Sequence, residues 1–275
     1  MDYIQAVVLG LVEGLTEFLP VSSTGHLTIA EKLLGLDVAD TTVTAYTAVI
    51  QMGAILAVVV YFWADIWRIA KAWAQGLVKP ELRGRLDHRM GWYIILGSVP
   101  IGVVGLLAKD VITGPLRSLW VVAAALIAWS AVMLYAERRG RQVRGEKDLT
   151  LKDALVVGLV QCVALVPGVS RSGATISTGL LVGLDRVTAT RLSFFLSIPA
   201  LFAAGLFELK DAVGGNIGIG QTVVGTVVSF VVAYATVAWL LRFVAGNSIG
   251  KFVPYRVALG VVLLVLLGVG AMAPT

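Results

Sequence analysis

Long apolar segments, separated by short polar stretches, run through almost the whole of this 275-residue sequence. Their apolar residues are continuous rather than alternating, and several segments approach the roughly 20 residues needed to cross a bilayer core. Charged residues make up only 14% of the chain, against about 25% in a typical soluble domain. Because every backbone amide must be satisfied internally in lipid, such runs form helices. The sequence therefore predicts an all-α, polytopic membrane protein.

Ten apolar segments can be distinguished, and they fall into two kinds. Six are long enough to be transmembrane helices, at 44–63, 91–107, 118–136, 190–209, 221–241 and 255–272. The other four form two pairs of short segments, 3–19 with 21–36 and 151–166 with 172–184. Pro20 interrupts the first pair and Pro167 the second, and proline ends a helix because it lacks an amide hydrogen and restricts its predecessor. Short broken segments are typical of re-entrant or discontinuous helices, so we expect about six transmembrane helices plus two re-entrant helix-loop-helix hairpins.

The two hairpins are related in sequence. A shift of 148 residues aligns 10–37 with the second hairpin and gives ten identities in 28 positions, including Val-Ser-x-x-Gly at both breaks and Gly-Leu-Asp at both ends. Three spans and one hairpin per half give the two copies opposite orientations, and inverted repeats place their site where the copies meet near mid-membrane. We expect one membrane domain over 1–275, made of two inverted repeats at approximately 1–136 and 151–272, joined by a basic cytoplasmic loop 137–150.

The net charge of +5 is concentrated in two of the interruptions. Eleven of the 22 basic residues lie there: Arg68, Lys71, Lys79, Arg83, Arg85 and Arg89 in 64–90, and Arg138, Arg139, Arg141, Arg144 and Lys147 in 137–150. Clusters that flank apolar segments are typical of cytoplasmic loops, so the charge indicates orientation and lipid contact, and no nucleic acid partner. This orientation opens the first hairpin, and with it the site, to the external side. His88 is interpreted as a solvated residue of the basic loop.

The first break carries many polar side chains for a membrane segment: Glu13, Glu17, Ser22, Ser23, Thr24 and His26, with Gly25 among them. Glu13 and Glu17 are four residues apart and project from one helix face. An ionised group at membrane depth costs at least roughly 2.5–3.5 kcal/mol, so two carboxylates there require a cation, a proton or water; pairing with Lys32 is the structural alternative. The hydroxyls begin the second half-helix, where free amides and the helix dipole favour phosphate, although Ser and Thr are also ordinary N-caps.

The second break repeats this arrangement and adds a cation. It reads Pro167-Gly168-Val169-Ser170-Arg171-Ser172-Gly173-Ala174-Thr175. Arg171 occupies the position of Ser23 in the first copy, and a guanidinium suits phosphate oxygens; a structural pairing with Glu13 or Glu17 is the alternative. Two carboxylates, one His, one Arg and six hydroxyls exceed what a fold requires. The sequence therefore predicts a site for a phosphorylated ligand where the two breaks meet.

The motifs at these breaks are similar to those of a known family. Residues 13–26 resemble the signature of the bacterial undecaprenyl-diphosphate phosphatases, the bacitracin-resistance family, and 167–175 resembles that family's second signature throughout. Residues 50–53 and 254–256 also resemble family features. The resemblance implies an enzyme of the bacterial inner membrane that hydrolyses the terminal phosphate of undecaprenyl diphosphate, giving undecaprenyl phosphate and inorganic phosphate and recycling the cell-wall carrier lipid. An inverted-repeat transporter or flippase for a phosphorylated lipid is the alternative, because the fold serves both.

The resemblance also implies a role for each motif residue. Glu13 and Glu17 would bind a divalent cation, Mg²⁺ or Ca²⁺, or act as bases. Ser23 would be the nucleophile with His26 as its proton partner or as the acid for the leaving group, while His26 or a water molecule remain alternative nucleophiles. Arg171 would hold the diphosphate. These five are the predicted catalytic residues.

The predicted substrate-binding residues are Ser22, Thr24, Gly25, Ser170, Ser172, Gly173, Thr175 and Arg256. The expected partners are a polyprenyl diphosphate lipid and the bilayer, and the sequence is compatible with a homodimer. Arg256 conflicts with the predicted topology, which places it at a cytoplasmic helix end, away from the outward-opening hairpin.

Overall fold

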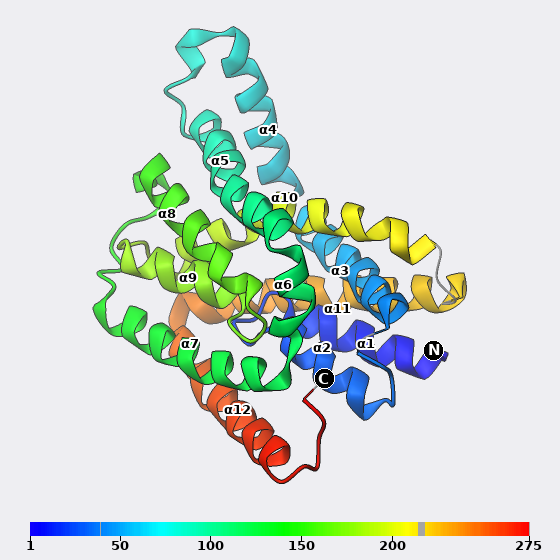
Figure 1. Cartoon of the computed structure of the whole chain (residues 1–275). Helices are drawn as coiled ribbons and strands as arrows, with labels where there is room; N and C mark the ends of the chain where they lie inside the picture. Colours follow the sequence, from blue (N-terminus) through cyan, green and yellow to red (C-terminus); the bar gives the residue numbers. More distant parts are fainter. Residues whose placement is uncertain (39, 214–217, 275) are drawn as a thin grey trace.

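A bundle of α-helices makes up the protein (Figure 1). The computed structural model describes residues 1–38, 40–213 and 218–274, so 39, 214–217 and 275 of the predicted domain lie outside it. Within those ranges there is no β-strand, only an isolated bridge between Arg144 and Leu184. In chain order the α-helices are α1 (Tyr3–Thr16), α2 (Ser23–Leu33), α3 (Thr41–Tyr61), α4 (Trp63–Val78), α5 (Leu86–Leu107), α6 (Lys109–Thr113), α7 (Leu119–Arg139), α8 (Leu151–Gln161), α9 (Arg171–Leu181), α10 (Arg186–Val213), α11 (Ile219–Gly246) and α12 (Val253–Gly268). Short 3-10 turns lie between them: η1 (Pro80–Leu82), η2 (Pro115–Arg117), η3 (Glu146–Asp148), η4 (Cys162–Leu165) and η5 (Ile249–Phe252).

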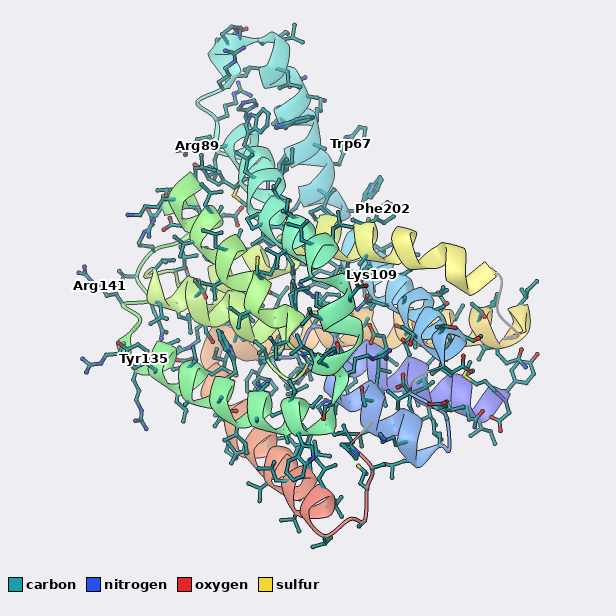
Figure 2. The ribbon with its side chains drawn as sticks, viewed as in Figure 1. Trp67, Arg89, Lys109, Tyr135, Arg141 and Phe202 are labelled. Atoms are coloured by element: carbon teal, nitrogen blue, oxygen red, sulfur yellow. The ribbon has the colours of Figure 1, made fainter. Side chains whose placement is uncertain are left out.

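Six helices in the described part of the chain are long and apolar enough to cross a membrane: α3, α5, α7, α10 as far as Gly205, α11, and α12 with its preceding turn. Each overlaps one of the six predicted segments, so the prediction of a polytopic all-α membrane protein is confirmed. Large apolar side chains face outward from these helices; Tyr135 of α7 and Phe202 of α10 both point away from the ribbon (Figure 2). Outward apolar side chains are what a hydrocarbon solvent favours.

Two helix-break-helix units interrupt this bundle, α1 with α2 and α8 with α9. The same backbone conformation recurs at both breaks. Ser22 has φ 76° and ψ 94°, and Ser170, 148 residues later, has φ 76° and ψ 122°. Positive φ is uncommon and strained for a residue with a Cβ, so the sequence repeat extends to a shared and costly backbone geometry. Re-entry of these units into a membrane stays a prediction.

The two halves interleave rather than pack as separate bodies. α1 of the first half packs against α11, and α8 of the second half packs against α5. Likewise α3 packs against α10, and α7 against α12 (Figure 1). Corresponding helices thus make corresponding contacts, while the repeats at 1–136 and 151–272 and their inversion across a membrane stay predictions.

The prediction of a loop over 64–90 is wrong for most of that segment. α4 and the start of α5 form an antiparallel helical hairpin that projects from the bundle (Figure 1). The solvated position predicted for His88 is wrong as well: its side chain is buried, with Nδ1 3.2 Å from the Trp73 carbonyl oxygen. Gly76 leaves the space that the imidazole fills, because a Cβ there would lie 2.1 Å from Nδ1. The exposed side chains of the hairpin are mixed: Trp67 is exposed (Figure 2), and so are Arg68 and Lys71.

Candidate active site

A cavity of about 120 Å³ lies where the two breaks meet. Its polar lining comes from both halves: Glu17, Ser22, Ser23, Thr24, Gln51, Ser170 and Arg171. The rest of its lining is apolar: Ile101 of α5, Ala164 and Leu165 of η4, Pro167, and Leu201 of α10. The predicted meeting of the two breaks is therefore present, with polar and apolar walls side by side.

Glu17 is the centre of the polar wall. Ser23 Oγ donates to Glu17 Oε2 at 2.5 Å, and Arg171 Nη2 donates to Glu17 Oε1 at 3.1 Å. Gln51 Nε2 lies 3.4 Å from the same Oε2. The carboxylate thus holds a hydroxyl on one oxygen and a guanidinium on the other. A hydroxyl bound to a carboxylate is placed to give up its proton.

Arg171 is held by the protein, but its Nε donor has no partner among the described residues. Its Nη1 donates to the Ser193 carbonyl oxygen at 3.3 Å, and its Cζ lies 5.8 Å from the centre of the Phe18 ring. Its Nε is buried and has no partner among the described residues. A buried unpaired donor on a charged group is costly, and a phosphate oxygen would satisfy it.

Glu13 is fully buried, and neither of its carboxylate oxygens has a hydrogen-bond partner in the described part of the chain. It lies beside Gln51 and Glu17, within electrostatic reach of Arg171. Oxygen donors of this kind suit Mg²⁺ or Ca²⁺, so the residues fit the predicted cation. No cluster of three or more His, Cys, Asp and Glu occurs in the described ranges. The remaining ligands would therefore be phosphate and water, which is how Mg²⁺ is commonly bound.

His26 makes different contacts from those predicted. Its Nδ1 lies 2.7 Å from the Ser22 carbonyl oxygen, so Nδ1 carries the proton and donates. Its Nε2 lies 2.5 Å from the Tyr255 hydroxyl, which then donates, and the two rings stack 5.6 Å apart. The Ser23 hydroxyl is therefore bonded to Glu17, not to His26. The sequence analysis gives Tyr255 no role, although Tyr255 lies in the segment 254–256 that resembles a family feature.

The N-cap serines join the two breaks to each other. Ser22 Oγ accepts from Gly25 N within its own helix start, at 3.4 Å, and from Gly168 N of the other break, at 3.0 Å. Ser170 Oγ likewise accepts from Gly173 N at 3.1 Å. These hydroxyls satisfy helix N-termini, so capping and site formation are combined in the same residues.

Two of the predicted ligand contacts point into the protein. Ser172 Oγ donates to the Leu19 carbonyl oxygen at 2.9 Å, and Thr175 Oγ1 lies 2.6 Å from Ser193 Oγ, with both side chains fully buried. Thr175 therefore supports the segment that carries Arg171. Thr24 is exposed and lines the cavity, and its contact with a ligand stays a prediction.

The predicted topology, which places Arg256 away from the first hairpin, is wrong on this point. This side chain is fully buried in the first turn of α12, where Nη1 donates to Pro20 O at 2.8 Å and Nη2 to Gly168 O at 2.9 Å and Val169 O at 3.1 Å. Its Nε donates to Ser130 Oγ at 3.1 Å. α12 begins beside the breaks rather than at the end of the bundle, so Arg256 joins the backbones of both breaks. The guanidinium thus positions the two breaks relative to each other, while its predicted contact with the substrate stays a prediction.

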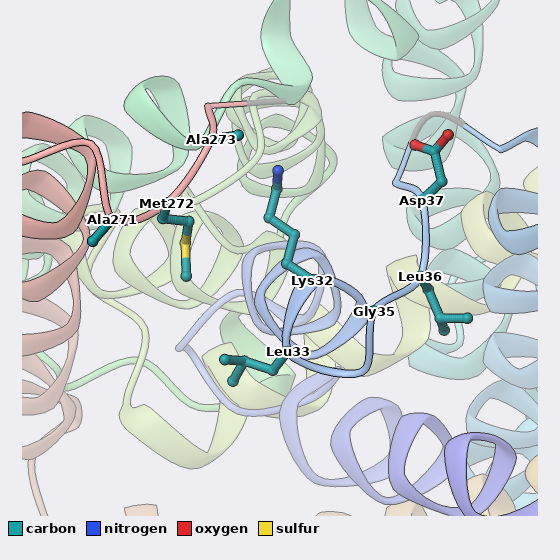
Figure 3. A pocket seen from close by; sticks show the side chains of 8 residues that line it. All are labelled: Lys32, Leu33, Gly35, Leu36, Asp37, Ala271, Met272 and Ala273. Atoms are coloured by element: carbon teal, nitrogen blue, oxygen red, sulfur yellow. The ribbon is translucent and has the colours of Figure 1, made fainter.

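A larger hollow of about 520 Å³ lies elsewhere, at the end of α2 and the C-terminal segment (Figure 3). Lys32 lies there between Asp37 and Ala271–Ala273 (Figure 3). It contains no residue of either motif, and Lys32 is its one basic lining residue. The smaller cavity is therefore the candidate site, because charge, hydroxyls and unsatisfied polar atoms converge there.

Fold and site together define a polytopic helical membrane protein with a buried carboxylate, hydroxyl and guanidinium site between two broken helices. The profile of the family described as Bacitracin resistance protein BacA matches residues 6–262, and the chain belongs to that family. Undecaprenyl-diphosphatase 1 of Frankia alni is 60% identical over 269 residues, covering 98% of this chain and 97% of that protein. Undecaprenyl-diphosphatase 1 of Streptomyces avermitilis is 58% identical, covering 98% of both chains. Undecaprenyl-diphosphatase of Cutibacterium acnes is 53% identical, covering 97% of this chain and 98% of that protein.

Proposed function

We propose that the chain hydrolyses the terminal phosphate of undecaprenyl diphosphate, with the site at the junction of the two breaks. The observation that carries the proposal is the contact of the Ser23 hydroxyl with Glu17, whose other oxygen binds Arg171. A carrier needs complementary charge to bind a phosphorylated headgroup, but transport does not require a hydroxyl that is hydrogen-bonded to a carboxylate. The names of the relatives, at more than half identity over nearly the full chain, support the same activity.

The proposed reaction breaks the phosphoric anhydride on the side of the terminal phosphorus. The Ser23 oxygen, or a water molecule in its place, attacks that phosphorus while Glu17 accepts the proton. The bond from phosphorus to the bridging oxygen breaks, and undecaprenyl phosphate leaves with the electron pair. When water attacks, inorganic phosphate forms directly; when Ser23 attacks, a water molecule then hydrolyses the phosphoserine, which releases inorganic phosphate and restores the Ser23 hydroxyl. Arg171 Nε is free to bind the negative charge that develops on the phosphoryl oxygens. His26 would donate a proton near the leaving group only if its present bond to Tyr255 is exchanged.

In this proposal a divalent cation is held by Glu13 and Glu17, and it neutralises diphosphate charge when bound. The unsatisfied carboxylate of Glu13 supports that placement. The diphosphate occupies the polar end of the cavity and the isoprenyl chain leaves past the apolar wall. The site opens to the external face of the bacterial inner membrane, on the charge argument given above.

The test is phosphate release from farnesyl diphosphate and from the C55 substrate by detergent-purified protein, with Mg²⁺ or Ca²⁺ and then with EDTA. Ser23→Ala, His26→Ala and Arg171→Ala are compared with wild type. We expect metal-dependent release by wild type that is lost in Arg171→Ala and Ser23→Ala. Wild-type protein that is folded but releases no phosphate from either substrate would contradict the proposal and favour a transporter or flippase.

A further inference from the structure

Gln161 is the counterpart of Glu13 in the second half. It ends α8, 148 residues after Glu13 in α1. Both side chains are fully buried. Both oxygens of Glu13, and both the oxygen and the nitrogen of the Gln161 amide, have no hydrogen-bond partner in the described part of the chain. Each half therefore buries one unsatisfied polar side chain at the same place in the repeat.

Such a group is expensive to keep. A buried donor or acceptor without a partner costs about 1–3 kcal/mol, and unsatisfied groups of this kind are few in native proteins. The fold does not use the Gln161 amide, because no described residue contacts it by a hydrogen bond. A partner from outside the chain would explain why the amide is there.

Gln161 precedes two of the cavity-lining residues by one helical turn. Ala164 and Leu165, three and four residues later in η4, line the cavity, and residues at these spacings share a helix face. On α1 the same spacing relates Glu13 to Glu17, which also lines the cavity. Each of the two polar side chains is therefore one helical turn from residues that line the same cavity, one in each half of the chain.

The two side chains differ in chemistry. A glutamine amide offers two N–H donors and one acceptor, whereas an ionised carboxylate only accepts. We propose that the Gln161 amide is a further ligand-binding group of the site, donating a hydrogen bond to a phosphate oxygen of the bound diphosphate or to a water bound to that oxygen. The assignment rests on the proposed function for the identity of the ligand. The first half would bind the cation through Glu13, and the second half would bind the anion through Gln161.

The test compares Gln161→Met and Gln161→Glu with wild type as detergent-purified full chains. Methionine keeps the volume and removes both polar atoms, while glutamate keeps the shape and removes the donors. Each variant is measured for kcat and KM with farnesyl diphosphate and for melting temperature. Ser177→Ala is the matched control, because Ser177 is also fully buried with an unpartnered hydroxyl, but no residue three or four positions from it lines the cavity.

We expect Gln161→Met to lower kcat/KM at least tenfold while its melting temperature stays the same or rises, since an unsatisfied group is removed. Gln161→Glu should raise KM further, because a carboxylate repels the diphosphate. A rise in KM at constant kcat in the methionine variant indicates a contact made equally with the bound substrate and the transition state, and a fall in kcat at constant KM indicates a contact made only in the transition state. Ser177→Ala should retain wild-type kcat/KM.

Two results would overturn the inference: wild-type kcat/KM in Gln161→Met, or a loss of activity accompanied by a lower melting temperature, which would make Gln161 a structural residue. An inactive wild type would contradict the proposed function instead. In that case inorganic pyrophosphate is the probe. It should raise the melting temperature of wild type more than that of Gln161→Met, and equal shifts would overturn the inference independently of catalysis.

Discussion

Arg171 illustrates how one side chain can be fixed by the protein and still serve a ligand. Two of its nitrogens are occupied, one by the Glu17 carboxylate and one by the Ser193 carbonyl, and the third, Nε, is unused. A planar guanidinium allows this division because its donors point in different directions. At the residue scale, geometry rather than charge alone therefore defines the role of Arg171.

Replacing Arg171 with lysine should separate charge from geometry. A single ammonium cannot hold Glu17 and the Ser193 carbonyl while also donating to phosphate, so we expect Arg171→Lys to reduce kcat by about 10²–10³-fold, as the loss of a donor to a developing oxyanion does. Phosphate release measured beside melting temperature checks this. Arg68→Lys is the control, because Arg68 is about half exposed and its carboxylate partners, Asp65 and Asp87, do not line the cavity. A wild-type kcat in Arg171→Lys would show that positive charge suffices.

At the scale of helices, close packing between the halves depends on glycine. A Cβ on Gly158 of α8 would lie 2.0 Å from the carbonyl oxygen of Gly97 in α5, and a Cβ on Gly10 of α1 would lie 2.6 Å from that of Gly225 in α11. The same kind of contact is thus made twice between the halves, once between α8 and α5 and once between α1 and α11. Helices that approach this closely leave no space for a side chain.

Gly158→Ala should therefore destabilise the protein. Overpacking costs roughly 1–3 kcal/mol, and about 1 kcal/mol corresponds to a melting temperature shift of about 2–4 °C in a chain of this size. Thermal unfolding of the detergent-purified variant measures the effect. Gly102→Ala in α5 is the control, since a Cβ there meets nothing within 4 Å. Equal melting temperatures for the two variants would show that α5 and α8 can separate without cost.

Elements were predictable where a local pattern determines them. Hydropathy predicts the six long helices, and Pro20 and Pro167 predict the breaks. α4 was missed because its apolar residues, such as Trp63 and Trp67, alternate with basic ones and gave no continuous apolar run. The motifs also predicted which breaks meet.

Contacts between distant residues were not predictable in the same way. His26 and Tyr255 are 229 residues apart in the chain, and no local pattern relates them. The position of Arg256 depended on where α12 begins relative to the breaks, which hydropathy does not determine. The burial of His88 depended on the packing of α4 against α5, an element absent from the prediction.

At the scale of the whole molecule, ion pairs fix the segment that joins the halves. Arg144, in that segment, bonds Asp153 at the start of α8 at 2.6 Å and the Val182 carbonyl after α9 at 2.8 Å. Burial would raise the pKa of Asp153, but hydrogen bonds from Arg144 and Thr150 outweigh it and hold the pKa below its ordinary value. Arg144 thus ties the joining segment to both helices of the second broken unit.

The stability that this pair contributes should depend on pH. Because the folded pKa of Asp153 is lowered, the contribution is complete above the unfolded pKa of about 3.9 and is lost as the pH falls through the folded value. Asp153→Asn should lower the melting temperature at pH 7 by an amount that shrinks below about pH 4. Unfolding from pH 3 to 7 checks this against Asp110→Asn, whose side chain is exposed. A difference in melting temperature between wild type and Asp153→Asn that stays constant with pH would contradict a contribution from ionised Asp153.

Arg256 also determines when the protein can become active during its synthesis. The first motif leaves the ribosome early, but the guanidinium that joins Pro20 to the second break belongs to a residue 236 positions later in the chain. A nascent chain can therefore insert most of its helices before this guanidinium is present. Competence for catalysis should appear abruptly, once α12 has entered the bilayer, and a chain truncated before residue 256 should be inert however many of its helices are in place.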